Sequence, residues 1–163
     1  MNLVTLATGV LALLGSALIG GVFFAFSSFI MKALARMPSS EGIAVMQSIN
    51  VVVINPPFIG AFMGTALLSI AVIVLVVMNG IIPASMFFIS GSVFYFVGTF
   101  LVTMFGNVPL NKQLAAASAT DPDAAVLWMH YLDRWTVWNH VRTAAAIVAA
   151  LFFTLGLVQV AAA

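Results

Sequence analysis

The sequence contains no cysteine and very few charged residues. The absence of cysteine excludes disulfides, thiolate metal sites and cysteine nucleophiles. Charged residues make up 6% of the chain, whereas a soluble domain carries about 25% because its surface must be hydrated. The net charge of +1 provides no basic patch or stripe of the kind that binds nucleic acid. With 64% hydrophobic residues and a mean hydropathy of +1.23, the chain is predicted to be an integral membrane protein.

Four apolar stretches are long enough to cross a hydrocarbon core about 30 Å thick, which requires about 20 helical residues. They cover roughly residues 3–30, 57–77, 82–105 and 138–160. They are continuously apolar rather than alternating, which favours helices over the strands of a barrel. The first stretch lacks a basic n-region and a convincing cleavage site, so we expect a span rather than a cleaved signal peptide. We predict an all-α fold, a membrane four-helix bundle that forms one domain.

Basic residues predict the orientation of the spans, because cytoplasmic loops carry an excess of Lys and Arg. Lys32 and Arg36 lie between the first two spans, and Lys112 and Arg134 lie between the last two. The short central turn and both termini carry no Lys or Arg. We therefore expect a multi-pass protein of the cell membrane, with both long loops in the cytoplasm and the termini on the opposite side.

Small residues recur at four-residue spacing on three spans. Such rows let helix backbones approach closely in a membrane, where lipid supplies no hydrophobic drive for helix association. They indicate a compact bundle. The rows are Ala12, Ser16 and Gly20; Gly60 and Gly64; and Ala145 and Ala149.

The first loop is predicted to contain a short amphipathic helix. Pro38-Ser39-Ser40-Glu41 is typical of a helix start with a hydroxyl cap and an acid in the first turn. A helix from there to about Val53 fits a segment lying on the bundle or on the membrane surface. Asn55-Pro56-Pro57 then ends this helix and starts the second span. The apolar face comprises Val45, Met46, Ile49, Val52 and Val53, with Asn50 inside the face and Gln47 at its border.

The second loop contains another helix start. Thr120-Asp121-Pro122-Asp123 provides a cap, a proline suited to the first helical position and a second acid. A helix that begins there can continue without interruption into the fourth span. One face of it would carry an aromatic stripe leading to Arg142, composed of Trp128, Tyr131, Trp135 and Trp138.

Arg142 is the only charged residue within the long apolar stretches. A guanidinium at membrane depth costs about 2.5–3.5 kcal/mol unless it is paired, hydrated or snorkelled. Asn139 lies three residues earlier and shares its helical face. Other polar residues gather where the spans meet the cytoplasm, and we expect the cluster to converge on Arg142. These are Gln47, Asn50, Asn55, Asn107, Asn111 and His140.

Each member of this cluster also has an ordinary structural interpretation. Trp and Tyr at a membrane boundary commonly form an interfacial belt, and Asn residues near helix ends commonly cap backbone groups. Arg142 lies about one turn inside the boundary, so snorkelling towards the headgroups is an alternative. Asn107 and Asn111 are four residues apart and suited to one helical face, although Pro109 between them favours a turn.

Five segments carry a family resemblance. They are FFAFSSFIM at 23–31, MQSIN at 46–50, NPPF at 55–58, GNVPLN at 106–111 and WTVWNHVRT at 135–143. In this order and spacing they resemble the anthrone oxygenase-like family of small four-span membrane proteins. Fungal relatives in that family are assigned the oxidation of polyketide anthrones to anthraquinones with dioxygen, without an evident metal or flavin. The resemblance therefore implies a membrane-embedded, cofactor-independent monooxygenase with a lipophilic aromatic, anthrone-type substrate.

Such a reaction makes three demands on the protein. An anthrone loses a proton from its acidic methylene, and the resulting carbanion reacts with dioxygen. The protein would supply an apolar slot for the rings, a base, and a cation or hydrogen-bond donors for the developing oxyanion. The predicted catalytic set is His140 as base, with Arg142, Asn139 and Asn107 around the oxyanion. The predicted substrate-binding set is Trp135, Trp138, Asn50, Gln47, Asn55 and Asn111.

The same sequence features are compatible with two other functions. A non-catalytic membrane protein would use the same cluster to join the helices and to hold a lipid or a quinone. A haem protein would use His130 or His140 as a ligand. No metal site is predicted, because these histidines are ten residues apart on a helix and lack a third ligand. No cofactor is predicted; the expected partners are membrane lipid and a lipophilic small molecule, with no nucleic acid, and a homo-oligomer is left open.

Overall fold

The computed structural model describes residues 1–118 and 121–163, and every regular element in these two ranges is helical. Four helical stretches are long and apolar enough to cross a membrane, namely Leu3–Leu34, Pro56–Met78, Ser85–Ala116 and Ala124–Ala161. The predicted all-α membrane four-helix bundle is therefore confirmed.

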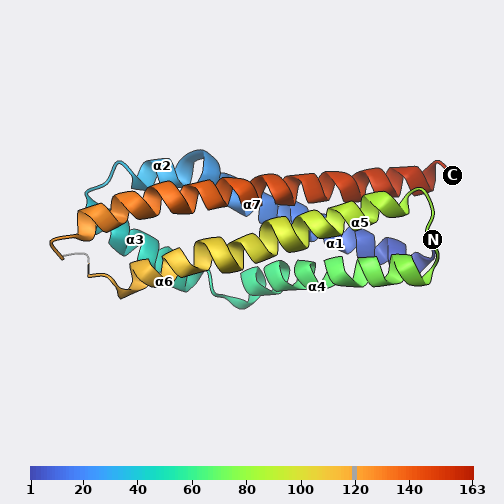
Figure 1. Cartoon of the computed structure of the whole chain (residues 1–163), viewed down its shortest axis with the longest axis horizontal. Helices are drawn as coiled ribbons and strands as arrows, with labels where there is room; N and C mark the ends of the chain where they lie inside the picture. Colours follow the sequence, from blue (N-terminus) through green and yellow to red (C-terminus); the bar gives the residue numbers. More distant parts are fainter. Residues whose placement is uncertain (119–120) are drawn as a thin grey trace.

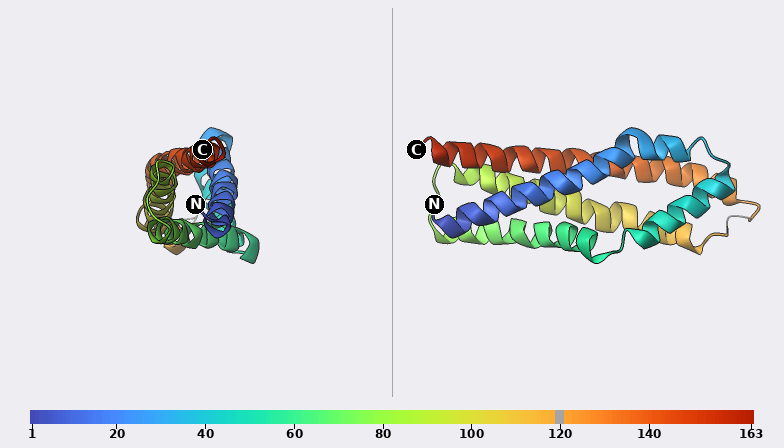
Figure 2. Two further views of the ribbon diagram at one scale, coloured as in Figure 1. Left: turned by 90° about the vertical axis from the view of Figure 1, so that its right-hand side faces the viewer. Right: turned by 180° about the vertical axis from the view of Figure 1, so that it is seen from behind.

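Four antiparallel rods run along the length of the molecule, as Figures 1 and 2 show. The first is a continuous helix of α1 (Leu3–Ala25), the π-helical segment η1 (Phe26–Ile30) and α2 (Met31–Leu34). The second consists of α3 (Ser39–Val52) and α4 (Pro56–Met78), placed end to end. The third contains α5 (Ser85–Val93), the π-helical segments η2 (Phe94–Leu101) and η3 (Thr103–Asn107), and α6 (Val108–Ala116). The fourth is the single helix α7 (Ala124–Ala161).

The second rod is broken at Asn55, which has an extended backbone with φ −122° and ψ 156°. Its side-chain oxygen accepts a hydrogen bond of 2.9 Å from the Phe58 N–H, which caps the start of α4. Its side-chain nitrogen donates to the Val52 carbonyl at 2.9 Å, so the same amide also caps the end of α3. Because both polar ends are used in this way, the structure gives Asn55 the capping role that was the alternative to substrate binding.

The third rod passes through Pro109 without a turn, contrary to the expectation from sequence. The two π-helical segments precede this proline, and the Val108 N–H bonds the Thr103 carbonyl five residues back. Pro109 then occupies the first turn of α6, where a missing N–H is tolerated. Asn107 and Asn111 therefore point from one side of a continuous helix.

The helix α3 packs on the bundle, the first of the two predicted locations, through a different set of residues from the predicted face. Its buried residues are Gly42, Ile43 and Met46, whereas the predicted face residues Val45 and Val52 are exposed. The close approach to α7 occurs at Gly42, where an added Cβ would lie 2.7 Å from the Trp128 ring. The predicted hydroxyl cap is also wrong, since α3 begins at Ser39 and no side chain caps it.

The helix α7 is about 57 Å long at 1.5 Å per residue, nearly twice the thickness of a hydrocarbon core. It begins at Ala124, with Asp123 at the capping position but no capping side-chain hydrogen bond. The predicted cap Thr120 lies outside the described residues. Every charged side chain other than Arg142 lies at one end of the bundle, formed by α2, α3, α6 and the part of α7 before Arg142. We call this the charged end.

Two rows of small residues pack as predicted and one does not. Ala12, Ser16 and Gly20 are buried, as are Ala145 and Ala149. Gly60 and Gly64, in contrast, face open space, since an added Cβ at either would meet nothing within 4 Å. The GxxxG of α4 therefore does not pack within the bundle.

The buried apolar residues form two separate cores along the bundle. The first core lies between α1, α4, the third rod and the later part of α7, and includes Phe23 and Tyr95. The second core lies at the charged end and includes Met46, Trp128 and Trp135. Arg142 lies between them, and the distance from it to the end of α7 at Ala161 is about 30 Å, close to one hydrocarbon thickness.

Candidate functional site

The Arg142 side chain points into the bundle, between the two cores. It is 6% exposed, so the alternative of snorkelling to the membrane surface is wrong. The guanidinium carbon lies 3.7 Å from the centroid of the Phe23 ring and 4.8 Å from that of the Trp135 ring. Two aromatic faces therefore contact the cation, an arrangement that stabilises a desolvated guanidinium by about 2 kcal/mol or more.

Two hydrogen bonds fix the orientation of the guanidinium. Its Nε donates to Oδ1 of Asn139 at 2.9 Å, and Nη1 donates to Oγ1 of Thr103 at 3.4 Å. Nη2 makes no hydrogen bond to the described residues, and no carboxylate in that part of the chain pairs with the cation. The Asp and Glu side chains are all exposed at the charged end. A buried positive charge without a counter-ion is costly, and it is the principal chemical feature of this site.

Asn139 is completely buried and connects Arg142 to the first rod. Its nitrogen donates to the Phe23 carbonyl at 2.9 Å and to Oγ of Ser27 at 2.7 Å, while its oxygen accepts from Arg142. The Ser27 hydroxyl also lies 3.0 Å from that of Thr143. All polar atoms of the Asn139 amide are thus occupied by the protein, which makes it a positioning group for the guanidinium.

A stacked aromatic column approaches Arg142 from the charged end. The rings of Trp128 and Tyr131 are 5.7 Å apart, and those of Tyr131 and Trp135 are 6.0 Å apart, with nearly parallel planes in both pairs. Asn111 fixes this column, since its Oδ1 accepts from the Tyr131 hydroxyl at 2.9 Å and from Nε1 of Trp135 at 2.8 Å. Asn50 adds a long hydrogen bond of 3.5 Å to the Tyr131 hydroxyl.

Asn107 completes the polar wall on the third rod. It is 0% exposed, and its Nδ2 donates to the Trp135 carbonyl at 3.1 Å. Its Oδ1 is buried and has no hydrogen-bond partner among the described residues. The available atom of Asn107 is therefore an acceptor, which repels an oxyanion; the expected contribution of Asn107 to oxyanion stabilisation does not fit this orientation.

Three other predicted residues lie apart from Arg142 and its contacts. Gln47 donates to the carbonyls of Leu114 and Ala117 at 2.8 and 3.0 Å, and so ties α3 to the end of α6. Trp138 is 36% exposed and packs against Gly106, where an added Cβ would lie 2.8 Å from its ring. His140 is exposed on the outer side of α7. Asn139, rather than Trp138, continues the buried stripe of α7 between Trp135 and Arg142.

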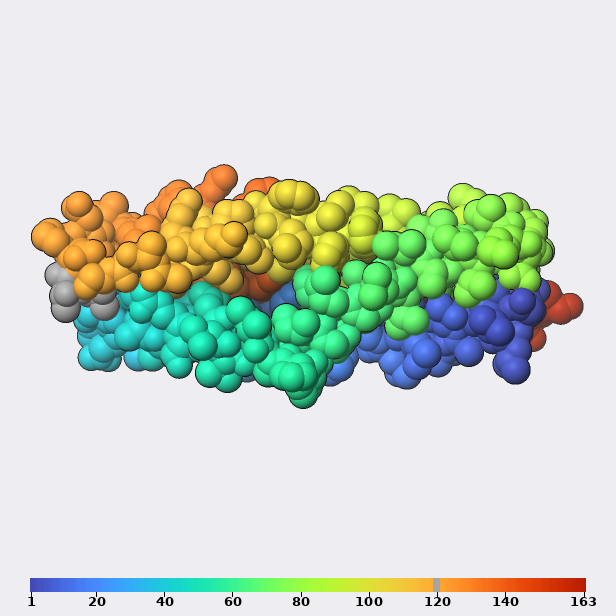
Figure 3. Space-filling view, turned by 90° about the horizontal axis from the view of Figure 1, so that it is seen from below, coloured from blue at the N-terminus to red at the C-terminus, as the bar shows by residue number. Residues whose placement is uncertain are grey.

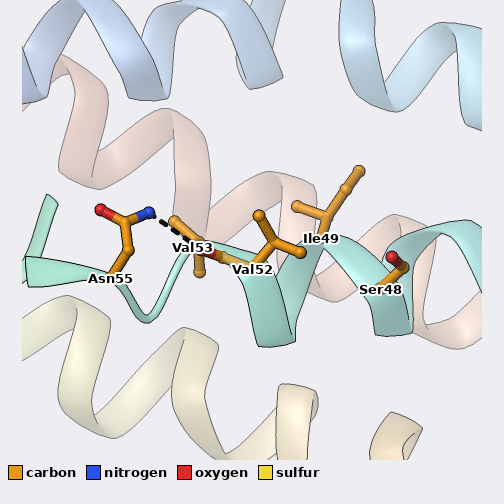
Figure 4. Close-up of a pocket in the computed structure, with 5 residues that line it drawn as sticks. All are labelled: Ser48, Ile49, Val52, Val53 and Asn55. Carbon is orange, nitrogen blue, oxygen red and sulfur yellow. Dashed lines mark hydrogen bonds between the residues drawn. The ribbon is translucent and has the colours of Figure 1, made fainter.

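Cavities open on the surface of the charged end, and two of them are lined by residues of α2, α3 and α7. One, of about 390 Å³, is lined by Ser48, Ile49, Val52, Val53 and Asn55 at the junction of α3 and α4 (Figure 4). Figure 3 shows that the surface is hollowed near this junction, between the second and third rods. The other cavity, of about 490 Å³, lies between α2 and α7, and its lining includes Lys32, Asp133 and His140. Neither cavity is lined by Arg142 or Trp135.

The acidic residues and the histidines do not form a common cluster in the described part of the chain. Within residues 1–118 and 121–163, no three His, Asp or Glu side chains gather as they would around a metal ion. His130 and His140 are both exposed on α7.

Sequence reasoning missed the hydroxyl groups and the phenylalanine that hold the guanidinium. Thr103, Ser27, Thr143 and Phe23 each contact Arg142 or Asn139, or bond to a residue that does. Two of the elements that supply them are π-helical: η1 carries Ser27, and η3 carries Thr103 and Asn107. Such segments are rare in proteins overall, but those that occur are frequently found at functional sites. The only signal for these residues in the sequence was the Ser27-Ser28 pair within a phenylalanine-rich run.

Comparison with known proteins identifies the family. The sequence profile described as anthrone oxygenase matches residues 58–152, which include Asn107, Trp135, Asn139 and Arg142. Neither the curated proteins nor the solved structures that were compared gave a match. The match covers more than half of the chain, and the chain therefore belongs to the anthrone oxygenase family.

Proposed function

We propose that this protein is a membrane-embedded, cofactor-independent oxygenase in which Arg142 binds the enolate of a lipophilic aromatic ketone of the anthrone type. The observation that carries the proposal is the buried guanidinium, which contacts two aromatic rings. Among the described residues it has no carboxylate partner, and one of its nitrogens makes no hydrogen bond. A site of this kind favours a flat, delocalised anion, because such a ligand supplies the missing negative charge.

The reaction balances with dioxygen as the only co-reactant. The methylene group of the substrate loses a proton to water, which gives the enolate. Its ring carbon then forms a bond to dioxygen, and the peroxide anion takes a proton back from the hydronium ion. The resulting hydroperoxide loses water to leave a carbonyl group. The substrate loses two hydrogens and gains one oxygen, and the second oxygen atom leaves as water. Dioxygen is reduced by four electrons and the methylene carbon is oxidised by four.

The residues around Arg142 have distinct parts in this proposal. The guanidinium favours the ionised substrate and remains opposite the negative charge as it passes to dioxygen. Asn139 and Thr103 hold the guanidinium in one orientation, so that little reorganisation is needed during the reaction. Trp135 and Phe23 supply an apolar, aromatic environment for the rings. His140 is not given the role of base, because its side chain lies on the outer side of α7.

The test is oxygen consumption by the purified protein in lipid nanodiscs with anthrone as substrate. We expect uptake of one dioxygen per quinone formed, at a rate well above that of empty nanodiscs. Arg142→Met should lower kcat/KM at least tenfold, because it removes the cation and keeps much of the side-chain volume. Arg36→Met is the matched control, since Arg36 is exposed at the charged end. Circular dichroism and thermal unfolding report whether each variant is folded.

The same measurements can reject the proposed activity or the proposed site. Equal oxygen uptake with protein and with empty nanodiscs would reject the oxygenase. A folded Arg142→Met variant with wild-type activity would reject the site. Loss of folding in Arg142→Met, together with no oxygen uptake by the wild type, would favour a protein in which this cluster only joins the helices.

A further inference from the structure

The side-chain carbonyl of Asn107 is a buried acceptor that the proposed reaction leaves unused. Three buried side-chain atoms lack a hydrogen-bond partner within the described ranges, and this is the one beside the Arg142 cluster. The orientation of the amide is fixed, because Nδ2 donates to the Trp135 carbonyl at 3.1 Å. If the amide were rotated by 180°, two carbonyl oxygens would face each other. Oδ1 is therefore an acceptor in need of a donor.

Asn107, which carries the unused acceptor, and Arg142, which carries the unused donor, both contact Trp135. Thr103 and Asn107 are four residues apart on η3 and lie on one side of it. The Thr103 hydroxyl accepts from Nη1 of Arg142, and Asn107 bonds the backbone of Trp135, whose ring lies 4.8 Å from the guanidinium carbon. Nη2 of Arg142 makes no hydrogen bond to any residue within 1–118 or 121–163.

We infer that Asn107 is a specificity-determining residue that accepts a hydrogen bond from a hydroxyl group of the substrate held at Arg142. This inference rests on the proposed function, and it adds that the preferred ligand carries two different oxygen groups. One is a carbonyl or enolate oxygen that accepts from Nη2 of Arg142. The other is a hydroxyl that donates to Oδ1 of Asn107.

Such a site discriminates against ligands that lack the hydroxyl group. A ligand with the ketone but without the hydroxyl leaves a buried acceptor unpaired, so it binds less well than its hydroxylated analogue. Sites built around a buried hydrogen bond reject the analogue that lacks it more strongly than apolar pockets reject an extra group. Asn107 therefore selects among flat aromatic ketones that Arg142 and Trp135 alone would accept equally.

The experiment measures binding and does not depend on turnover. The probes are unreactive quinones: 9,10-anthraquinone and its monohydroxylated 1- and 2-isomers, titrated against tryptophan fluorescence of the protein in nanodiscs. We expect the better hydroxylated isomer to bind about tenfold tighter than the parent quinone. Asn107→Leu should reduce this preference to within about twofold by weakening only the hydroxylated ligand. Asn79→Leu, at the opposite end of the bundle, is the control.

The results separate this inference from the proposed function. Equal binding of all three quinones to the wild type, or an unchanged preference in Asn107→Leu, overturns the inference. If the preference is present and depends on Asn107 but anthrone consumes no dioxygen, the inference stands and the oxygenase is rejected. If anthrone is oxidised but no hydroxyl preference exists, the reverse holds. Should Asn107→Leu fail to fold, Asn107→Ser replaces it, with an expected loss of at least threefold in the preference.

Discussion

Arg142 of α7 lies over the ring of Phe23 from α1, with 3.7 Å between the guanidinium carbon and the ring centroid. Phe23 belongs to the first core, and Trp135, on the other side of the cation, belongs to the second. The guanidinium therefore fills the position at which the two cores meet. A buried guanidinium ordinarily pairs with a carboxylate, whereas this one contacts two aromatic rings.

The Phe23 contact predicts a difference between two adjacent phenylalanines. Phe23→Leu should lower the free energy of unfolding by about 2–3 kcal/mol, through loss of the cation–π contact and of ring packing. Phe24→Leu is the control, because Phe24 is exposed on the outside of α1. It should change stability by less than about 0.5 kcal/mol. Thermal and denaturant unfolding in detergent measures both, and equal effects would contradict the contact.

The hydrogen bond between Asn111 and Tyr131 predicts that substitutions of these two residues have non-additive effects on stability. Asn111→Leu leaves the Tyr131 hydroxyl and Nε1 of Trp135 without their acceptor, and should cost about 1–3 kcal/mol of stability. Tyr131→Phe removes one of these donors, so the same Asn111 substitution should cost less in that background. A double-mutant cycle measures the difference. Strictly additive effects would show that the hydrogen bond contributes nothing to stability.

Glycine substitutions distinguish the buried side of the bundle from its lipid-facing side. Gly98→Ala would place a Cβ 2.6 Å from the Cβ of Ala145, a short side chain that cannot rotate away. It should therefore force the third rod away from α7 and lower the unfolding temperature. Gly60→Ala meets nothing within 4 Å and should be neutral or slightly stabilising. A clear destabilisation by Gly60→Ala would instead indicate a close contact made between copies of the chain.

The distribution of Lys and Arg predicts the orientation in the membrane, and the absence of cysteine makes this easy to test. Single-cysteine variants Ser40→Cys and Ala163→Cys lie at opposite ends of the bundle, and both positions are exposed. In intact cells, a membrane-impermeant maleimide should label Ala163→Cys and not Ser40→Cys. Permeabilised cells should show labelling of both. The reverse pattern in intact cells would show that the charged end faces outwards.

Hydropathy and residue spacing were sufficient to predict the four membrane-spanning helices and most of the face of α7 that carries Arg142. The i to i+3 relation between Asn139 and Arg142 predicted their contact correctly. Contacts between rods were harder to predict from the sequence, because they depend on how each helix is rotated about its axis. Trp138 and Asn139 are adjacent, and a small rotation decides which of them is buried; sequence favoured the tryptophan on the stripe, whereas the structure buries the asparagine.

The hydroxyl groups that bind Arg142 and Asn139 could not be predicted from the sequence for a different physical reason. A threonine within an apolar helix usually bonds its own backbone, as Thr103 does with the Thr99 carbonyl at 2.8 Å. Its second contact, with Arg142, depends on the π-helical register of η3, which composition does not reveal. The role of Asn55 was ambiguous for a similar reason, since both capping and ligand binding require the same amide.

The continuity of α7 has a consequence for how the protein unfolds. This one helix supplies Trp128 and Trp135 to the second core and Phe153 to the first, without a break between them. Unfolding of either core would expose a segment of α7 that belongs to the other, so we expect the two cores to unfold in a single transition although their apolar residues do not mix. The second rod, divided at Asn55, transmits no such coupling. The first rod is also unbroken, and it supplies Phe23 to the first core and Met31 to the second. Coupling between the membrane portion and the charged end therefore depends on the continuous rods and on the cation that α7 places between the two cores.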